Sequence, residues 1–539
     1  MQASGIHHME LVLLFLLLLV AGLATLARRF KTPYPIVLVI GGLALSFVPN
    51  LPHISLNPNM VFLVFLPPLL YAAAYNTAWR DFRHNIVSIL MLAFGLVGFT
   101  VLGVALGSGW ILPGFDFRLG AVLGAAIATT DAIALGAIAK RVGLPRRILD
   151  ILEGESLVND ASGLLALQFT IALVVTGQKP TLLDAVGKLA WLVAGGIIAG
   201  LVAAFIIQRI LHYITDAPIE ITLSLGTPYI AYLFGDGIHA SGVLAAVACG
   251  LYMGRKGSET YEPGTRLQSS AVWNTLDFIL NGTVFVLIGL QLPFILRGIR
   301  EVSLAMLLRD AACVIAFVVV LRLVWVYFGA WFAWGIRSKL LRQDEARPGG
   351  KYVFLVGWTG MRGVIALAAA ISLPRTLANG APFPERDVIV FITFCVIFVT
   401  LVLQGLTLPA VIRKLGFSAG KGGPIEEHEA RRVILHSVLD RLNELQLKSK
   451  AEHAAVYEDF VRHYSDRLAL LESGADVADK DKQQQEMAAA RYFRSLSRDL
   501  RALERSTALR LRNEDKINDN VLRTIERELD LAEVRHQSP

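Results

Sequence analysis

Residues 153–160 read Glu-Gly-Glu-Ser-Leu-Val-Asn-Asp and lead straight into an apolar segment that continues to about Val175. A second acid, Asp131, lies inside the preceding apolar segment, at residues 125–135. Carboxylates are costly inside a membrane helix and usually mark an ion or proton pathway. Two such acids beside hydroxyls and an amide predict an oxygen cage for a small cation that competes with protons.

The composition is that of a membrane protein. Of 539 residues, 54% are hydrophobic and only 18% are charged, which is too apolar for a soluble chain. The three cysteines lie in apolar stretches without metal-ligand spacing and are expected to be small core residues. We expect contact with membrane lipid, and we expect no cofactor, no enzymatic activity and no nucleic-acid partner.

Apolar segments of spanning length recur along the chain. A span needs about 20 mainly apolar residues, and each must be a helix or a broken helix because lipid leaves no backbone group unpaired. We therefore expect an all-α polytopic protein with about thirteen transmembrane helices. The segments are residues 10–27, 35–49, 60–76, 86–112, 117–139, 150–176, 186–208, 219–234, 238–254, 271–296, 304–333, 353–373 and 387–412.

Basic residues predict which side of the membrane each loop faces. No Lys or Arg precedes the first segment, whereas Arg28, Arg29 and Lys31 follow it, so we expect an outside N-terminus rather than a cleaved signal peptide. Loops on the predicted inner side are richer in Lys and Arg than loops on the outer side. Arg297 and Arg300 are an exception, because they lie in a loop predicted to be outside. Thirteen spans then place the C-terminal tail in the cytoplasm, and the expected setting is a bacterial inner membrane.

The composition changes after about Phe417. We expect residues 1–415 to be the transmembrane domain, residues 416–424 a linker and residues 425–539 a charge-rich helical tail with few Gly and Pro. A cytoplasmic tail is placed to sense internal pH or to bind a cytoplasmic regulator.

Two predicted segments carry a charge inside a stretch that should unwind easily. Thr130 and Asp131 precede Ala-Ile-Ala-Leu in the fifth segment, and Gly360-Met-Arg362-Gly363 precedes Val-Ile-Ala-Leu in the twelfth. The two segments are equivalent if the first six and the last six segments are repeats, and the odd offset between them gives inverted topology. Paired interrupted helices of this kind point to a transport site near the midplane of the membrane.

A helix from residue 153 onward would place the polar side chains on adjoining faces. Ser156 and Asp160 are i,i+4 neighbours, as are Glu155 and Asn159, and the rise from residue 155 to residue 160 is about 7.5 Å at about 1.5 Å per residue. A hard monovalent cation takes carboxylate, hydroxyl and carbonyl oxygens as ligands. An unwound stretch at residues 129–131 would offer carbonyls to the same cation.

Several motifs together resemble a known transporter family. They are Glu155-Ser-Leu-Val-Asn-Asp160, the Thr-Asp of the fifth segment, Gly360-Met-Arg-Gly363 with the later Ser372-Leu-Pro374, and Leu66-Pro-Pro-Leu-Leu-Tyr-Ala-Ala73. On these motifs, about residues 10–415 resemble the sodium/proton exchangers of monovalent cation:proton antiporter family one, bacterial type. The Glu-Ser-x-x-Asn-Asp element is the most specific of them.

The resemblance implies a fold and a set of roles. The implied fold has thirteen helices, with a domain for homodimerisation and a six-helix core that moves like an elevator. Asp160 is implied as the main carrier of cation and proton. Asp131, Ser156 and the backbone carbonyl of Thr130 are implied to complete the cage around the transported Na⁺.

Four of these positions keep a structural alternative. Glu155 is implied to act through water and Arg362 to balance charge where the two broken helices cross, but Glu155 could instead pair with Arg362. Asp131 could be an N-cap at a helix break. Asn159 either holds the fifth segment or only fills space.

Other polar positions in apolar segments have structural interpretations. Arg322, within Leu-Arg-Leu-Val, is expected to form a buried ion pair or to extend to the membrane surface rather than to bind the cation. Asp277 and Asn281 are expected to be structural. Many relatives have an acid where Ala72 stands, so any role of that acid in cation access or pH response is in doubt for this chain.

The leading hypothesis is electroneutral exchange of one Na⁺ for one H⁺, for pH and sodium homeostasis. Burial raises the pKa of a carboxylate and a bound cation lowers it, so one carboxylate that holds either a proton or a cation couples the two fluxes. Relatives with Asp-Asp where this chain has Asn159-Asp160 are the electrogenic branch, so the resemblance implies one-for-one exchange.

Two alternatives stay open. Within transport, Li⁺ or K⁺ could replace Na⁺, up to a K⁺-selective antiporter, because selectivity depends on fine cage geometry. In a different class, Asp131 and Asp160 could be the catalytic dyad of an intramembrane aspartyl protease. The sequence lacks the Gly-x-Gly-Asp element of that class, and Phe234-Gly-Asp-Gly237 has the wrong order.

Overall fold

The described part of the chain is helical. The computed structural model describes residues 2–49, 58–142, 144–176, 182–261, 263–299, 303–340, 342, 347–377, 380–417, 422–448 and 454–473, and short pieces between residues 500 and 525. Within these residues, extended pairing is limited to an isolated bridge between Thr376 and Pro382. The all-α class expected from the sequence is confirmed.

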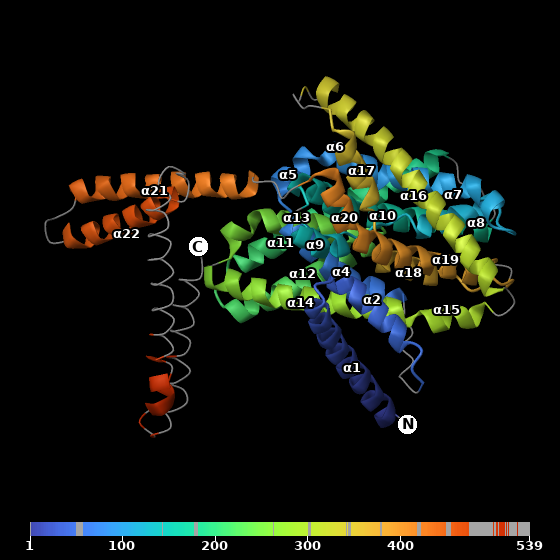
Figure 1. The fold of residues 1–539 in the computed structure, drawn as a ribbon, viewed down its shortest axis with the longest axis horizontal. Helices are drawn as coiled ribbons and strands as arrows, with labels where there is room; N and C mark the ends of the chain where they lie inside the picture. Colours follow the sequence, from blue (N-terminus) through green and yellow to red (C-terminus); the bar gives the residue numbers. More distant parts are fainter. Residues whose placement is uncertain are drawn as a thin grey trace. The chain divides into compact units, whose positions relative to one another are not determined.

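Among the described residues up to Leu415, the regular elements are helices and short π-helical segments (Figure 1). In chain order they are α1 (Gln2–Arg29), α2 (Tyr34–Leu45), α3 (Pro58–Met60), η1 (Val61–Phe65), α4 (Leu66–Asn76), α5 (Trp79–His84), α6 (Ile86–Leu90), η2 (Met91–Leu96), α7 (Val97–Ile111), α8 (Phe117–Ala126), α9 (Ala132–Val142), α10 (Arg146–Thr176), α11 (Leu182–Leu211), α12 (Ala217–Gly237), α13 (Gly242–Thr260), α14 (Pro263–Leu290), α15 (Leu292–Gly298), α16 (Leu304–Gly335), η3 (Ile336–Leu340), α17 (Gly350–Trp358), α18 (Val364–Ile371), α19 (Arg386–Val399), η4 (Thr400–Gln404) and α20 (Gly405–Leu415).

Every expected apolar segment falls on one of these helices or on consecutive ones. Within the described residues, seven stretches are long and apolar enough to cross a membrane by length and composition. They are Pro58–Asn76, Ile86–Ile111, Arg146–Val175, Val186–Leu211, Gly264–Gly298, Leu304–Lys339 and Arg386–Leu415. The total of thirteen crossings and the two inverted repeats stay predictions.

Two segments are interrupted where the sequence predicts unwinding. Residues 127–131 separate α8 from α9, and residues 359–363 separate α17 from α18. The interruptions touch, because the backbone N–H of Asp131 donates to the carbonyl of Met361 at 2.8 Å. Gly363 permits this approach, since a Cβ at that position would overlap the side chain of Asp131. The two broken helices therefore cross at their irregular residues.

The unbroken helix α10 packs against this crossing. It contacts α8, α9 and α18 as well as η2. A Cβ at Gly163 would overlap the side chain of Thr129, so the missing side chain lets α10 lie close to the first interruption. The polar run of residues 153–160 is thereby held beside the irregular backbone.

A smaller apolar core lies among α4, α11, α12 and α13. Its buried members include Tyr71, Ala204, Ala231 and Met253. The main core extends over helices on both sides of the crossing, from α2 and α8 to α18 and α19. Helix α14 packs along α2 with nearly touching backbones, because a Cβ at Gly42 would lie 2.5 Å from the carbonyl oxygen of Val286.

The chain forms two compact units, Met1–Gly420 and Lys421–Pro539. In the second unit, α21 (Gly422–Lys448) and α22 (Ala454–Ser473) pack against each other. Their apolar seam includes Val438, Leu442 and Phe460. Much of the remaining tail lies outside the described residues, and the expected domain boundaries stay predictions.

Candidate ion-binding site

Ser156 ties α10 to the first interruption. Its Oγ donates to the carbonyl of Thr130 at 2.9 Å and accepts from the backbone N–H of Ala132 at 3.2 Å. The hydroxyl thus satisfies one acceptor of the irregular backbone and the first N–H of α9. The Thr130 carbonyl has a second lone pair, so it can still take a cation as a ligand.

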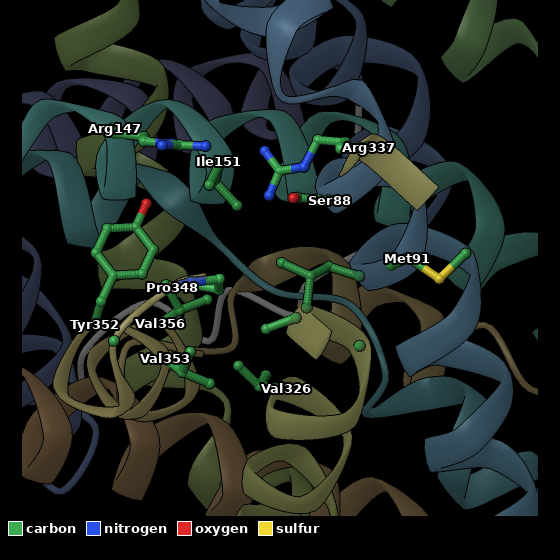
Figure 2. A pocket seen from close by; sticks show the side chains of 14 residues that line it. Ser88, Met91, Arg147, Ile151, Val326, Arg337, Pro348, Tyr352, Val353 and Val356 are labelled. Atoms are coloured by element: carbon green, nitrogen blue, oxygen red, sulfur yellow. The ribbon is translucent and has the colours of Figure 1, made fainter. Parts of the chain in front are cut away.

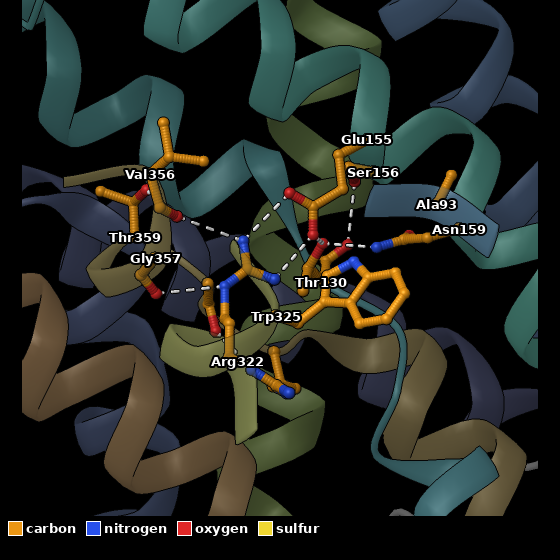
Figure 3. A network of polar contacts seen from close by, with 12 residues as sticks. Ala93, Thr130, Glu155, Ser156, Asn159, Arg322, Trp325, Val356, Gly357 and Thr359 are labelled. Atoms are coloured by element: carbon orange, nitrogen blue, oxygen red, sulfur yellow. Dashed lines mark hydrogen bonds and ion pairs between the residues drawn. The ribbon is translucent and has the colours of Figure 1, made fainter. Parts of the chain in front are cut away.

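Thr130 is also held through its side chain (Figure 3). Its Oγ1 donates to Oε1 of Glu155 at 3.1 Å and accepts from Nδ2 of Asn159 at 2.5 Å. Both partners come from α10, where Glu155 and Asn159 are i,i+4 neighbours on one face. Asn159 therefore holds the broken helix, which was one of the two alternatives open for it.

Glu155 forms a buried ion pair with Arg322 of α16 (Figure 3). The guanidinium binds the carboxylate bidentately, NH1 to Oε1 at 2.7 Å and NH2 to Oε2 at 3.0 Å. Its Nε also donates to the carbonyl of Gly357 at 3.1 Å, close to the second interruption. The alternative in which Glu155 pairs with Arg362 is therefore wrong, and of the two structural interpretations given for Arg322 the structure shows the buried ion pair.

Arg362 forms hydrogen bonds with the irregular backbone of both interruptions. It is 1% exposed, and its Nε donates to the carbonyl of Ile127 at 2.9 Å while NH1 donates to the carbonyl of Gly360 at 2.7 Å. Its own N–H donates to Oγ1 of Thr400 at 3.2 Å. Arg362 therefore joins the two interruptions and satisfies a carbonyl in each, which helix ends buried in protein require.

Asp160 and Asp131 line one cavity of about 330 Å³ at the crossing. Asp160 is 3% exposed and Asp131 is partly buried. Thr129, Thr130 and Ser156 line the same cavity, so carboxylate-bearing and hydroxyl-bearing residues share one lining, while their binding of a cation stays a prediction. Glu155 is absent from its lining.

Some lining residues have no predicted role. Among the described residues, none hydrogen-bonds to the buried Oγ1 of Thr129, which makes this hydroxyl a further candidate ligand. On the opposite wall, Asp277 of α14 accepts from Asn281 at 2.9 Å, and Tyr34 and Glu153 also line the cavity. The signal for Asp277 was in the sequence, since an acid inside an apolar span usually marks a pathway.

Comparisons with known proteins agree on one family. The family model described as "Sodium/hydrogen exchanger, transmembrane" matches residues 15–414. An uncharacterized Na(+)/H(+) exchanger of Mycobacterium tuberculosis is 32% identical over 526 residues, covering 95% of this chain and 94% of the relative. A sodium, potassium, lithium and rubidium/H(+) antiporter of Bacillus pumilus is 34% identical over 447 residues, covering 80% of this chain and 66% of the relative.

A solved structure has the same fold. The sodium proton antiporter MjNhaP1 from Methanocaldococcus jannaschii matches with a TM-score of 0.59 at 20% sequence identity. The match covers 76% of this chain and 99% of that protein. At this identity the likeness shows the fold alone, and it agrees with the helical architecture described above.

Proposed function

The chain belongs to the sodium/hydrogen exchanger family, and on this premise we propose that it exchanges Na⁺ for H⁺ across a membrane, one for one. The observation that carries the proposal is the cavity at the helix crossing, where Asp160 and Asp131 share a wall with three hydroxyl-bearing residues. A carboxylate in such a place can hold a proton or a cation but not both. That competition couples the two fluxes.

Asp160 is the proposed carrier, and Asp131, Ser156 and the Thr130 carbonyl are its proposed partners around Na⁺. These groups supply the oxygen ligands that hard cations take. Glu155 contacts the proposed cage indirectly, because it accepts a hydrogen bond from the side-chain hydroxyl of Thr130. Its charge is balanced by Arg322, so we assign it to positioning, and its action through water stays a prediction.

One-for-one exchange follows from the charges around the carrier. Asn159 is neutral, and the Glu155–Arg322 pair has no net charge. We further propose that Asp131 keeps its charge throughout the cycle, as a ligand of the cation. Asp160 is then the group whose charge alternates between a proton and a cation, and each cycle moves one of each. The wider cation range named for the Bacillus pumilus relative makes Li⁺ and K⁺ the other substrates to test.

The proposed setting is a bacterial inner membrane, in which the protein is a homodimer with an outside N-terminus and a cytoplasmic tail. In that place Na⁺/H⁺ exchange would serve pH and sodium homeostasis. These points rest on the charge pattern of the loops and on the family resemblance.

Proteoliposomes test the proposal. Vesicles with an acidic interior and an enclosed pH dye should alkalinise when Na⁺ is added outside, and thiocyanate, which collapses a membrane potential, should leave the rate unchanged. Asp160→Asn should abolish the signal, because an amide carries neither a proton nor a full negative charge. Asp216→Asn is the matched control, since Asp216 precedes α12 and makes no side-chain capping bond.

Exchange that persists in well-folded Asp160→Asn would refute the assignment of the carrier. Parallel runs with Li⁺ and K⁺ determine the cation range. Acceleration by thiocyanate would show electrogenic exchange and contradict the one-for-one stoichiometry.

A further inference from the structure

A second cavity has a volume of about 160 Å³ (Figure 2). It is enclosed by α6 and η2, the first turns of α10, the end of α16 with η3, and the start of α17. It shares no lining residue with the cavity of Asp160. The ion-exchange proposal gives it no role.

Polar groups gather at one end of this pocket (Figure 2). Arg147 and Arg337 extend their guanidinium groups there from two different helices, together with the hydroxyls of Ser88 and Tyr352. Arg337 is only 4% exposed. Both arginines also interact elsewhere in the protein, but a guanidinium has five N–H donors and can bind a further acceptor. Paired guanidinium groups favour a phosphate, which they bind with forked, charge-assisted hydrogen bonds.

The other end of the pocket is apolar (Figure 2). Met91, Val326, Val353 and Val356 line it, and all four are side chains suited to an alkyl chain. The ligand that fits the whole pocket is therefore amphipathic, with an anionic head and an apolar tail.

Exposed aromatic residues flank the pocket along α16. Pocket residues Gly329 and Ala330 lie in sequence between aromatic residues that are about half exposed, namely Tyr327 (47%), Phe328 (53%), Trp331 (54%) and Phe332 (45%). Trp and Tyr are enriched where a membrane protein meets the lipid headgroups. Basic pockets between membrane helices bind anionic headgroups at that level.

We propose that this pocket binds an anionic phospholipid, with the phosphate at Arg147 and Arg337 and the upper acyl chain against Val326, Val353 and Val356. The bound lipid would brace α10 against α17 next to the buried ion pair. Ile151 of the pocket lies one turn before Glu155 on α10, and the carbonyl of Val356 accepts from Arg322 at 3.4 Å. Binding should therefore raise the thermal stability of the membrane unit.

Melting curves of the full-length protein in neutral detergent test the proposal. The probes are phosphatidylglycerol, phosphatidylcholine with the same chains, and inorganic phosphate, and the readout is Tm from tryptophan fluorescence. Only phosphatidylglycerol should raise the Tm of the unaltered protein saturably. Loss of a charge-assisted contact in Arg147→Gln should weaken the apparent affinity by about tenfold or more.

Two further variants sharpen the test, because Arg337 is too buried for its loss to be informative. Gly329→Leu is designed to occlude the pocket without changing charge, and its Cβ would make ordinary van der Waals contact with Nε1 of Trp325, at 3.4 Å. It should lose the lipid response as Arg147→Gln does. Arg118→Gln removes an exposed arginine outside the pocket lining and should respond like the unaltered protein.

Three results would overturn the proposal. The first is an unchanged response to phosphatidylglycerol in both folded pocket variants. The second is equal stabilisation by phosphatidylcholine, which would mean that the headgroup charge is not recognised. The third is equal stabilisation by inorganic phosphate, which would make this a site for a free anion.

Discussion

A buried carboxylate can carry an ion only if its charge is not already balanced. Both oxygens of Glu155 accept from Arg322, and Glu155 is 0% and Arg322 1% exposed. Asp160 and Asp131 line the cavity, whereas Glu155 does not. These contacts divide the acids into two groups, one that lines the proposed cation cavity and one that pairs with Arg322 between α10 and α16.

Removing Arg322 should therefore reduce the stability of the fold more than it changes the proposed cation ligands directly. Arg322→Ala leaves the Glu155 carboxylate buried and unpaired, a loss of about 3–5 kcal/mol, and should lower the Tm of the detergent-purified protein markedly. The double variant Glu155→Leu/Arg322→Met should recover part of the loss, because no unpaired charge remains.

Arg309→Ala is the matched control for this experiment. Arg309 also lies on α16 and pairs with an acid, Asp310, but its side chain is 61% exposed, against 2% for Arg322, so solvent screens this pair and its loss should cost less. If Arg322→Ala melts no lower than Arg309→Ala, the ion pair is not what holds α10 to α16.

The ion-pair partner of Glu155 could not be predicted from the sequence, because it depends on how the helices pack. Two arginines, at positions 322 and 362, lie in apolar segments, and either could neutralise a buried acid. Arg322 is 167 positions from Glu155, and its reach depends on how α16 packs, which local patterns do not encode. The acids of the proposed cage, in contrast, could be identified from the sequence. A carboxylate inside an apolar helix is energetically costly, so each such residue stands out by itself.

The two interrupted helices are joined to each other by hydrogen bonds. Their irregular residues are joined by the Asp131–Met361 backbone hydrogen bond and by Arg362, which bonds a carbonyl in each. The interruptions themselves were predictable, since Thr and Gly beside a charge weaken an apolar helix locally. Their direct contact joins residues far apart in sequence, and a crossing of the two helices was expected only from the family resemblance.

Gly363→Ala tests whether this close contact matters for transport. A Cβ at residue 363 would overlap the side chain of Asp131, so the interruptions must move apart and displace a cage residue. The initial rate of Na⁺-driven alkalinisation should fall by about tenfold or more, because a shift of about 1 Å at a site can cost about a hundredfold. Melting curves should show that the variant still folds.

Gly226→Ala is the control for the glycine substitution. Gly226 lies within α12 with no atom within 4 Å of its added Cβ, so Ala should be neutral or should stabilise the helix by up to about 1 kcal/mol. A full transport rate in Gly363→Ala would show that the crossing tolerates separation and that the cage does not depend on it.

For the whole molecule, the sequence predicted the helical class and the approximate position of each segment. Apolarity and segment length are local properties, so they survive without knowledge of packing. The set of residues that lines the cavity could not be predicted from such local properties. Asp277 and Tyr34 both line the cavity and belong to α14 and α2, which pack along each other through contacts such as the one at Gly42.

The division of the chain into two units leads to a prediction about the tail. The membrane unit ends near Gly420, the family match ends at residue 414, and every proposed ligand lies before that point. Truncation after Phe417 should therefore leave Na⁺/H⁺ exchange in proteoliposomes intact. If the tail senses internal pH, the pH at which the rate is half-maximal should shift while the maximal rate stays.

Truncation eight residues earlier, after Pro409, is the matched control. It removes the last turns of α20, including Ile412, which is 1% exposed in the main core. This shorter protein should lose thermal stability and transport together, because burial of such a side chain contributes about 1.5–3 kcal/mol. Loss of transport from well-folded protein that ends at Phe417 would place an essential element in the tail, and exchange could not then be assigned to the membrane unit alone.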